Sequence, residues 1–204
     1  MTIQVSEVSC AFGERTVLQT FTATFKAGQI TALTGPSGSG KTTLLNMLGG
    51  LTTPDSGTIA FEGLDIASMK SGARRRFRRA NVGYLFQDYG LVPDLSVVEN
   101  IKIAVPRVSR ETMAEALTEV GLGGTEKRTV SELSGGEQQR IALARLILAQ
   151  PKIVLADEPT GALDETNAQL VLKHLRQFAQ GGAVVVVATH SAFIANSSDG
   201  VVEL

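Results

Sequence analysis

The sequence has little cysteine and no long apolar run. The first shortage argues against a disulfide-bonded protein, and the second argues against a membrane-spanning one. A single cysteine, Cys10, among 204 residues excludes an internal disulfide and suits a reducing cytoplasm. The longest apolar runs, such as AVVVVA at 183–188, fall far short of the ~20 residues of a membrane-spanning helix. The first residues, MTIQVSEVSC, lack the basic start and apolar block of a signal peptide. We therefore expect a cytoplasmic protein.

Neither sign of charge dominates the chain. Nineteen Lys and Arg against 20 Asp and Glu give a formal net charge of −1, which argues against a nucleic-acid partner. The hydrophobic content of 43% predicts a folded protein with a sizeable core, not a disordered one. No repeat or linker is apparent, so we expect one domain over residues 1–204, with an inserted lobe possible at this length.

One segment departs from this balance of charge. ARRRFRRA at 73–80 places five arginines around Phe77 on an expected helix before a strand. A solvated helix face is the simple interpretation. Contact with acidic lipid headgroups or with an acidic loop of a partner is the alternative.

Apolar strands alternate with helices along much of the sequence. Short apolar or alternating runs at 21–26, 29–35 and 58–63 predict strands, and a helix is expected from Lys41 to about Leu48. Strand patterns return at 152–157 and 183–190, separated by a helix around Val171, Leu175 and Phe178. Before these two strands, residues 88 to 150 have helical periodicity. We expect an α/β P-loop NTPase fold: a mostly parallel core sheet, an antiparallel β part and an inserted helical lobe at about 88–150.

A phosphate-binding loop is the most specific motif. GPSGSGKT at 35–42 fits the pattern G-x-x-x-x-G-K-[ST], with a strand before it and a helix after it. Its glycines let backbone N–H groups surround a triphosphate at a positive helix end, Lys41 adds a charge for the outer phosphates, and the Thr42 hydroxyl can ligate Mg²⁺. The predicted nucleotide-binding residues of this segment are Gly35, Pro36, Ser37, Gly38, Ser39, Gly40, Lys41, Thr42 and Thr43.

Two adjacent carboxylates at the end of a strand complete the predicted site. In KIVLADEP (152–159) Asp157 ends an apolar run and Glu158 follows at once. The two charges would repel each other without a cation, so we infer a metal ion there. Asp157 then holds Mg²⁺, directly or through water, and Glu158 is left to polarise an attacking water.

The stretch LSGGEQQRIALAR at 133–145 predicts a helix with an unusual start. Ser134 and Glu137 have the spacing of a capping box, yet Gly135 and Gly136 fill the first turn, where each costs up to ~1 kcal/mol relative to alanine. A capping box needs no glycine. The pattern therefore indicates that something comes close to the bare helix end.

With these motifs in order, the sequence resembles the nucleotide-binding subunit of ABC transporters over nearly its full length. LSGGE at 133–137 matches the family signature, and LFQD carries the glutamine loop as Gln87. GALD is similar to the D-loop and contains Asp164, and ATHS carries the switch histidine as His190. Phe12 lies where the family places an aromatic ring, often tyrosine, that stacks on adenine; phenylalanine keeps the stacking and loses any hydroxyl contact.

The resemblance implies an ATPase whose two copies pair head to tail, so that the signature of one subunit covers the ATP bound by the other. Ser134, Gly135 and Gly136 would then contact the γ-phosphate of the partner's nucleotide. By the same analogy His190 contacts the γ-phosphate, Gln87 reaches Mg²⁺ and the water, and ATP with Mg²⁺ is the cofactor pair. The catalytic set implied is Glu158, His190, Lys41 and Gln87, with Thr42, Gln87 and Asp157 around the metal. His174, mid-helix and outside these motifs, is interpreted as a surface or interhelical residue.

VGYLFQDYGLVPDLSVVENI (82–101) is similar to the subgroup of macrolide-exporter, lipoprotein-release and bacteriocin-export ATPases. This resemblance implies a transmembrane permease partner, and hence a peripheral position on the inner face of the cell membrane, with export as the favoured direction. Two alternatives stay open. One is a division-associated ATPase of the same subgroup, and the other is an ABC ATPase outside transport, whose usual coiled coils, zinc modules or second cassette we do not find.

Overall fold

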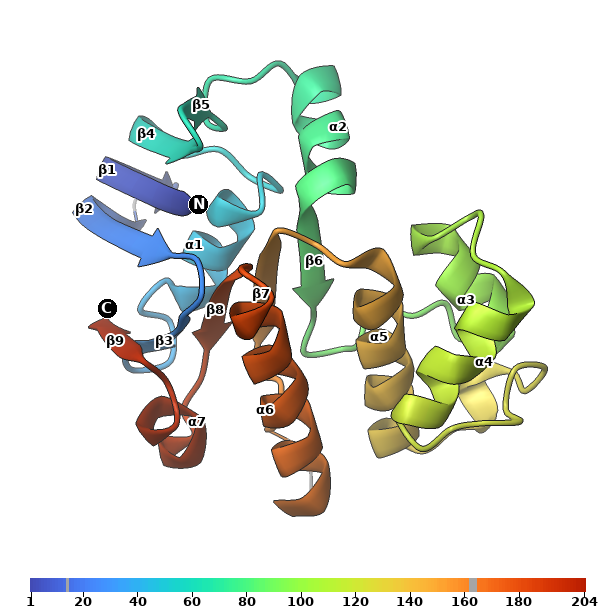
Figure 1. Ribbon diagram of the computed structural model, residues 1–204. Coiled ribbons are helices and arrows are strands. Elements are labelled where there is room, and N and C mark those ends of the chain that lie inside the picture. The colour runs from blue at the N-terminus through green and yellow to red at the C-terminus, as the bar shows by residue number, and fades with distance from the viewer. Residues whose placement is uncertain (14, 162–164) are drawn as a thin grey trace.

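The computed structural model describes residues 1–13, 15–161 and 165–204, and its strands form two sheets (Figure 1). One is a five-stranded sheet in the order β6-β7-β8-β3-β9, in which all neighbours are parallel. The other is a four-stranded antiparallel sheet in the order β2-β1-β4-β5. The expected parallel core and antiparallel part are both confirmed.

The parallel sheet consists of short apolar strands because helices cover both of its faces. Its strands are β3 (Ile30–Thr34), β6 (Val82–Leu85), β7 (Ile153–Asp157), β8 (Val184–Ala188) and β9 (Gly200–Glu203). In β7, Val154 and Ala156 pack into one hydrophobic core, while Ile153 and Leu155 pack into the other. Side chains alternate between the faces of a strand, so a strand with a core on each side needs an unbroken apolar run.

The antiparallel sheet closes the second of these cores. It contains β1 (Thr2–Phe12), β2 (Arg15–Lys26), β4 (Ser56–Phe61) and β5 (Leu64–Asp65). Cys10 is buried there, and burial raises the pKa of its thiol, with the charge of Asp55 adding to the effect. The sequence pattern at 21–26 marked only the last part of β2.

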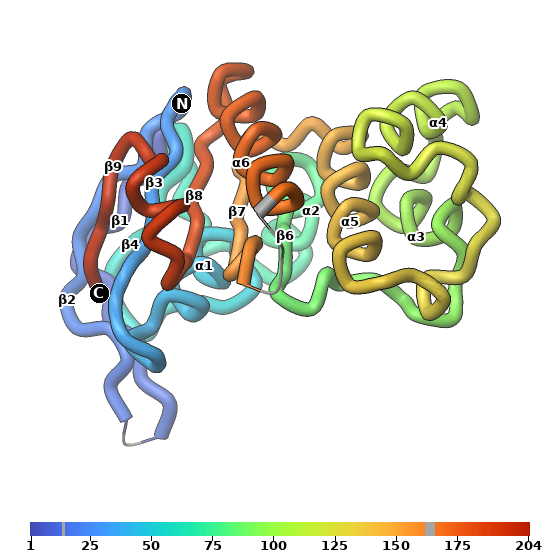
Figure 2. Tube along the Cα trace, turned by 90° about the horizontal axis from the view of Figure 1, so that it is seen from below, coloured from blue at the N-terminus to red at the C-terminus, as the bar shows by residue number. Residues whose placement is uncertain are grey.

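Helices α1 (Lys41–Leu48), α6 (Glu165–Gln180) and α7 (Ala192–Asn196) lie against the parallel sheet. Helices α3 (Val97–Ala104), α4 (Arg110–Glu119) and α5 (Gly135–Ala149) lie together at one side of the molecule, as Figures 1 and 2 show, and we name these three helices the helical lobe. Figure 2 also shows that the antiparallel sheet lies at the opposite end. Within the described residues, no helix is both long enough and apolar enough to cross a membrane.

The arginine-rich segment forms helix α2 (Ser71–Asn81), with Phe77 buried edge-on against Phe61. Two arginines bind backbone carbonyls: Arg74 donates to Met69 O at 3.2 Å and Arg78 to Gly50 O at 2.8 Å. The solvated-face interpretation therefore holds only for the other three arginines, which are exposed: Arg75, Arg76 and Arg79.

Candidate nucleotide-binding site

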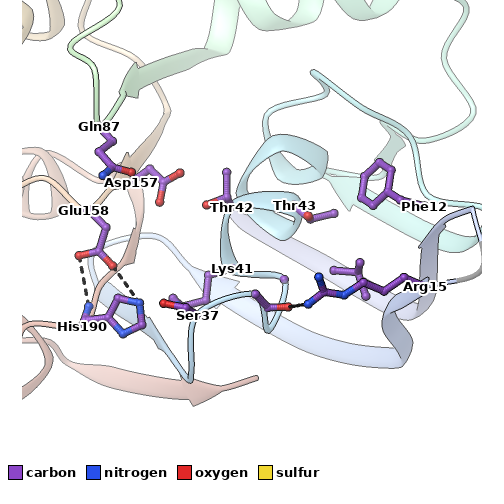
Figure 3. A pocket seen from close by; sticks show the side chains of 13 residues that line it. Phe12, Arg15, Ser37, Lys41, Thr42, Thr43, Gln87, Asp157, Glu158 and His190 are labelled. Atoms are coloured by element: carbon purple, nitrogen blue, oxygen red, sulfur yellow. Dashed lines mark hydrogen bonds and ion pairs between the residues drawn. The ribbon is translucent and has the colours of Figure 1, made fainter.

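Three segments meet at the carboxyl edge of the parallel sheet. The loop after β3, the residues that end and follow β7, and the residue pair after β8 come together there, because parallel strands end at the same edge. They surround a cavity of about 450 Å³ (Figure 3). Its lining comprises Phe12, Arg15, Val17, Ser37, Gly38, Gly40, Lys41, Thr42, Thr43, Gln87, Asp157, Glu158 and His190.

Lys41 begins helix α1 and is only 7% exposed. Its ammonium group donates to Gly35 O at 2.8 Å and to Pro36 O at 3.0 Å, so the loop closes around it. Gly40, the N-cap of α1, provides no side chain for the first N–H groups of the helix. Those donors and the positive end of the helix dipole suit an anion, and a buried lysine adds a full charge.

The phosphate loop needs glycine for steric reasons of its own. Gly35 has φ 137°, and a Cβ there would lie 2.3 Å from the backbone oxygen of Leu204. Gly40 has φ 103°, and a Cβ there would lie 2.9 Å from the side chain of Val17. Both glycines are therefore required by this fold before any ligand is considered.

Thr42, Gln87 and Asp157 present oxygen atoms to the cavity (Figure 3). Burial raises the pKa of the Asp157 carboxyl, while the Thr42 hydroxyl and the Lys41 charge act in the opposite direction. Among the described residues, no group of three or more His, Cys, Asp or Glu is arranged so that it could hold a metal ion. One carboxylate, one hydroxyl and one amide oxygen fit Mg²⁺, which completes its shell with water and substrate phosphates.

Glu158 has a left-handed backbone with φ 46°, which is uncommon for a residue with a side chain. Its carboxylate accepts the backbone N–H of His190 at 3.2 Å, and its Oε1 lies 3.6 Å from His190 Nε2 (Figure 3). The sequence predicted roles for both residues but not this contact. The pair can bind a water or a phosphate oxygen between a base and a donor.

The far end of the cavity holds Phe12 and a residue that the sequence analysis missed. Phe12 is 60% exposed, so one face of its ring is available for stacking. Arg15 begins β2 and donates from Nη2 to Gly38 O at 3.2 Å, which ties the start of this strand to the phosphate loop. No local sequence pattern indicated this contact, because its acceptor is a backbone carbonyl 23 residues away.

The signature residues are not part of this cavity in the same chain. Ser134 caps α5 through a capping box: its hydroxyl accepts Glu137 N at 3.3 Å, and the Glu137 carboxylate accepts Ser134 N at 2.8 Å. These contacts lower the pKa of the Glu137 carboxyl, the backbone N–H of Ser134 most of all. A Cβ on Gly136 would meet nothing closer than 3.5 Å, so packing within this chain does not require that glycine.

Three other predicted residues, Gly35, Pro36 and Ser39, also lie outside the cavity lining. Gly35 and Pro36 face Lys41 through their carbonyls, and Ser39 has a buried hydroxyl with no hydrogen-bond partner among the described residues. Asp164 lies outside the described residues. His174, interpreted as a surface or interhelical residue, is 1% exposed and faces Glu119 of the helical lobe at 3.7 Å, so the surface alternative is wrong. Burial lowers the pKa of its imidazole, against the opposing effect of Glu119.

Protein sequences similar to this chain include ATP-binding proteins of ABC transporters. An uncharacterised ABC transporter ATP-binding protein of Mycobacterium tuberculosis is 44% identical over 184 residues, covering 87% of this chain and 56% of that protein. The macrolide export ATP-binding/permease protein MacB of Escherichia coli is 40% identical over 212 residues, covering 99% of this chain and 33% of that protein. The chain thus spans about half or less of the length of these relatives.

Solved structures give the same result. The dimeric MJ0796 structure, a bacterial ABC transporter cassette, matches with a TM-score of 0.91 and 30% identity, covering 99% of this chain and 94% of that one. A dimeric post-hydrolysis state of MJ0796 bound to ADP and Pi matches with a TM-score of 0.90 and 29% identity. The ABC transporter family model matches residues 18–161. The chain therefore belongs to the ABC transporter family and is one of its ATPase cassettes.

Proposed function

We propose that this chain binds ATP with Mg²⁺ and hydrolyses it in a head-to-tail pair of identical subunits that drives a membrane permease. The observation that carries the proposal is the separation of two phosphate-compatible surfaces. Lys41 and the start of α1 lie in the cavity, whereas the bare start of α5 at Ser134–Gly136 lies outside it. A second copy can bring its α5 end to this cavity, and the dimeric relatives support that arrangement.

Within the cavity the proposal gives each residue a role. Phe12 stacks on adenine, the loop 35–43 binds the phosphates, and Lys41 neutralises the outer ones. Thr42, Asp157 and Gln87 would hold Mg²⁺, which when bound offsets charge on the β- and γ-phosphates. Glu158 accepts a proton from the attacking water.

His190 contributes a donor for the γ-phosphate. Its contact with Glu158 supports this role, because the same two groups would face one water and one phosphate oxygen. In the partner's cavity, the N–H groups at 135 and 136 and the Ser134 hydroxyl would meet the γ-phosphate from the opposite side. Asp164 of the D-loop would lie near this junction by family analogy.

The membrane partner is proposed from the relatives. MacB carries its permease in the same polypeptide, and this chain matches one third of it. We therefore propose that the cassette acts with a transmembrane permease on the inner face of the cell membrane, in the direction of export. A division-associated ATPase of the same subgroup is the second candidate, and the motif-bearing segment 82–101 favours neither.

Glu158→Gln tests the shared site. The amide keeps the shape of the side chain and loses the base, so hydrolysis should fall by about 10²–10⁴-fold while ATP still binds. Unhydrolysed ATP should then hold two subunits together. Size-exclusion chromatography with light scattering should show a monomer without nucleotide, a dimer with ATP and Mg²⁺, and a monomer again with ADP.

The matched control is the same variant carrying Lys41→Ala, which should stay monomeric because its phosphate loop lacks the charge for the outer phosphates. A Glu158→Gln protein that binds millimolar ATP and remains monomeric would refute the ATP-bound dimer.

A further inference from the structure

One buried polar side chain connects the signature helix to the catalytic loop of the same subunit. Gln139 lies in α5, five residues after Ser134, and is only 4% exposed. Its amide group donates to the carbonyl oxygen of Pro159, the residue that directly follows Glu158. A buried amide without a hydrogen-bond partner is destabilising, so this contact fixes the Gln139 side chain on the Pro159 carbonyl.

The carbonyl that Gln139 holds belongs to a backbone segment in an uncommon conformation. Glu158 is left-handed at φ 46°, and such a conformation persists only where its surroundings impose it. Two contacts come from the backbone on either side: Glu158 N donates to Ala188 O at 2.9 Å, and Gly161 N donates to Glu158 O at 3.2 Å. Gln139 supplies a third contact, and it alone of the three comes from the helical lobe.

The neighbouring residue strengthens the same connection. Arg140 donates from Nη1 to the side-chain oxygen of Asn167 in α6. Two consecutive residues of α5 thus make hydrogen bonds to this part of the chain: Gln139 to Pro159, directly after Glu158, and Arg140 to Asn167, near the start of α6. A shift of α5 would therefore act directly on the Pro159 carbonyl through this hydrogen bond.

We propose that Gln139 is a positioning residue that sets the geometry of Glu158. This inference rests on the proposed function, in which Ser134–Gly136 at the start of the same helix bind the partner's nucleotide. Contact at the start of α5 is then transmitted through Gln139 to the catalytic carboxylate of the same subunit. Each ATP would thereby affect hydrolysis at the other site.

Gln139→Met tests the connection, because methionine fills a similar volume and cannot donate a hydrogen bond. We expect kcat for ATP hydrolysis to fall by about 10–100-fold with KM for ATP within about twofold, since small misplacements of a reacting group have effects of this size. Gln138→Met is the matched control. Its amide donates to Leu133 O at 2.9 Å, just before α5, and makes no hydrogen bond to the described part of the segment after Glu158, so the variant should keep its kcat.

The Glu158→Gln background separates this inference from the proposed function. Glu158→Gln with Gln139→Met should still dimerise with ATP, because the signature contacts remain. Loss of that dimer would mean that Gln139 supports the signature helix itself, and an unchanged kcat in Gln139→Met would remove the link to Glu158. Failure of Glu158→Gln alone to dimerise would instead count against the shared site.

Gln139→Glu adds a readout that a packing role would not produce. An ionised carboxylate cannot donate to Pro159 O, whereas the protonated acid can, and burial raises the pKa of a carboxyl. The activity of Gln139→Glu relative to wild type should therefore rise as the pH is lowered from about 8 to about 6. A constant ratio across this range would contradict the hydrogen-bonding role.

Discussion

The phosphate loop and the signature helix both contain glycines, but for different reasons. In the phosphate loop, Gly40 has a positive φ and would clash with Val17 if it carried a Cβ. In the signature helix, Gly136 has an ordinary helical backbone and space for a Cβ to 3.5 Å. The first glycine is demanded by the chain's own conformation. The second has no such steric cause among the described residues. Under the proposed function, it leaves room for the partner's nucleotide.

This difference separates the two halves of the proposed composite site. The loop half is pre-formed: its lysine is buried, its hydrogen bonds are made and its backbone is fixed. The signature half is capped, and both Ser134 and Gly135 are exposed. One half can therefore be tested in a monomer, and the other only in a pair.

The largest expected effect comes from disabling each half separately. Lys41→Ala should abolish turnover and weaken ATP binding by the monomer, because a charge-assisted phosphate contact is lost. Ser134→Arg should also abolish turnover, yet leave ATP binding by the monomer nearly intact. ATP binding by fluorescence titration and phosphate release distinguish the two.

Mixing the two variants sharpens the comparison. A mixed dimer has one composite site with both defects and one with neither, so partial ATPase activity should return. If the mixture stays inactive while both proteins fold and mixed dimers form with ATP, either the sites are not shared or both must function for any turnover.

Alanine at the two glycines should have opposite effects on stability. Gly40→Ala should lower the free energy of unfolding by about 1–3 kcal/mol, since alanine at positive φ is strained and crowds Val17. Gly136→Ala should raise it by up to ~1 kcal/mol through helix propensity, while hydrolysis falls. Urea denaturation and phosphate release measure the two quantities.

Gly72→Ala is the control for the helical glycine. Gly72 is the second residue of α2, as Gly136 is the second residue of α5, and a Cβ there meets nothing within 4 Å. It should gain stability like Gly136→Ala but keep full activity. Equal activity in both alanine variants would show that no ligand approaches Gly136.

The smallest expected effect concerns the cap of the signature helix. The Ser134 contacts hold the pKa of Glu137 below its ordinary value of 4.5, so its carboxylate contributes stability above that pH and loses it as the pH falls through the lowered pKa. Glu137→Ala should cost about 0.5–1 kcal/mol at pH 7, and the difference from wild type should shrink toward pH 3. Thermal melts at both pH values measure it. Glu115→Ala, at an exposed position of α4, should cost less at pH 7.

Local sequence patterns predicted the parallel core well. The buried strands β7 and β8 read as apolar runs because both their faces are covered, and α1 has the bounds 41–48 that were expected. Strand β1 and the strands at the two ends of the chain were harder to delimit from the sequence. Strand β1 has shifts in register between Val5 and Ala11, so its bounds could not be read from alternation, although the segment around Cys10 is strand-like in sequence.

The residues of the candidate site also fall into those that could be assigned from the sequence and those that could not. Residues in contiguous motifs, such as Lys41 and Asp157, could be assigned from the sequence because strand order brings them to one edge. Arg15 and Gln139 could not, since each acts through a backbone carbonyl far away in sequence, at Gly38 and Pro159. A carbonyl carries no residue identity, so no pattern of letters records such a contact.

The two carbonyls that hold the Lys41 ammonium have a thermodynamic consequence for nucleotide binding. The Lys41 ammonium is already hydrogen-bonded to two carbonyl oxygens before a phosphate binds. Phosphate oxygens would therefore replace carbonyl oxygens around a side chain that is already ordered. Little rotamer entropy of that lysine is then lost on binding. Calorimetry should accordingly attribute much of the difference between ATP and ADP to desolvation of the γ-phosphate, and little of it to ordering of the loop.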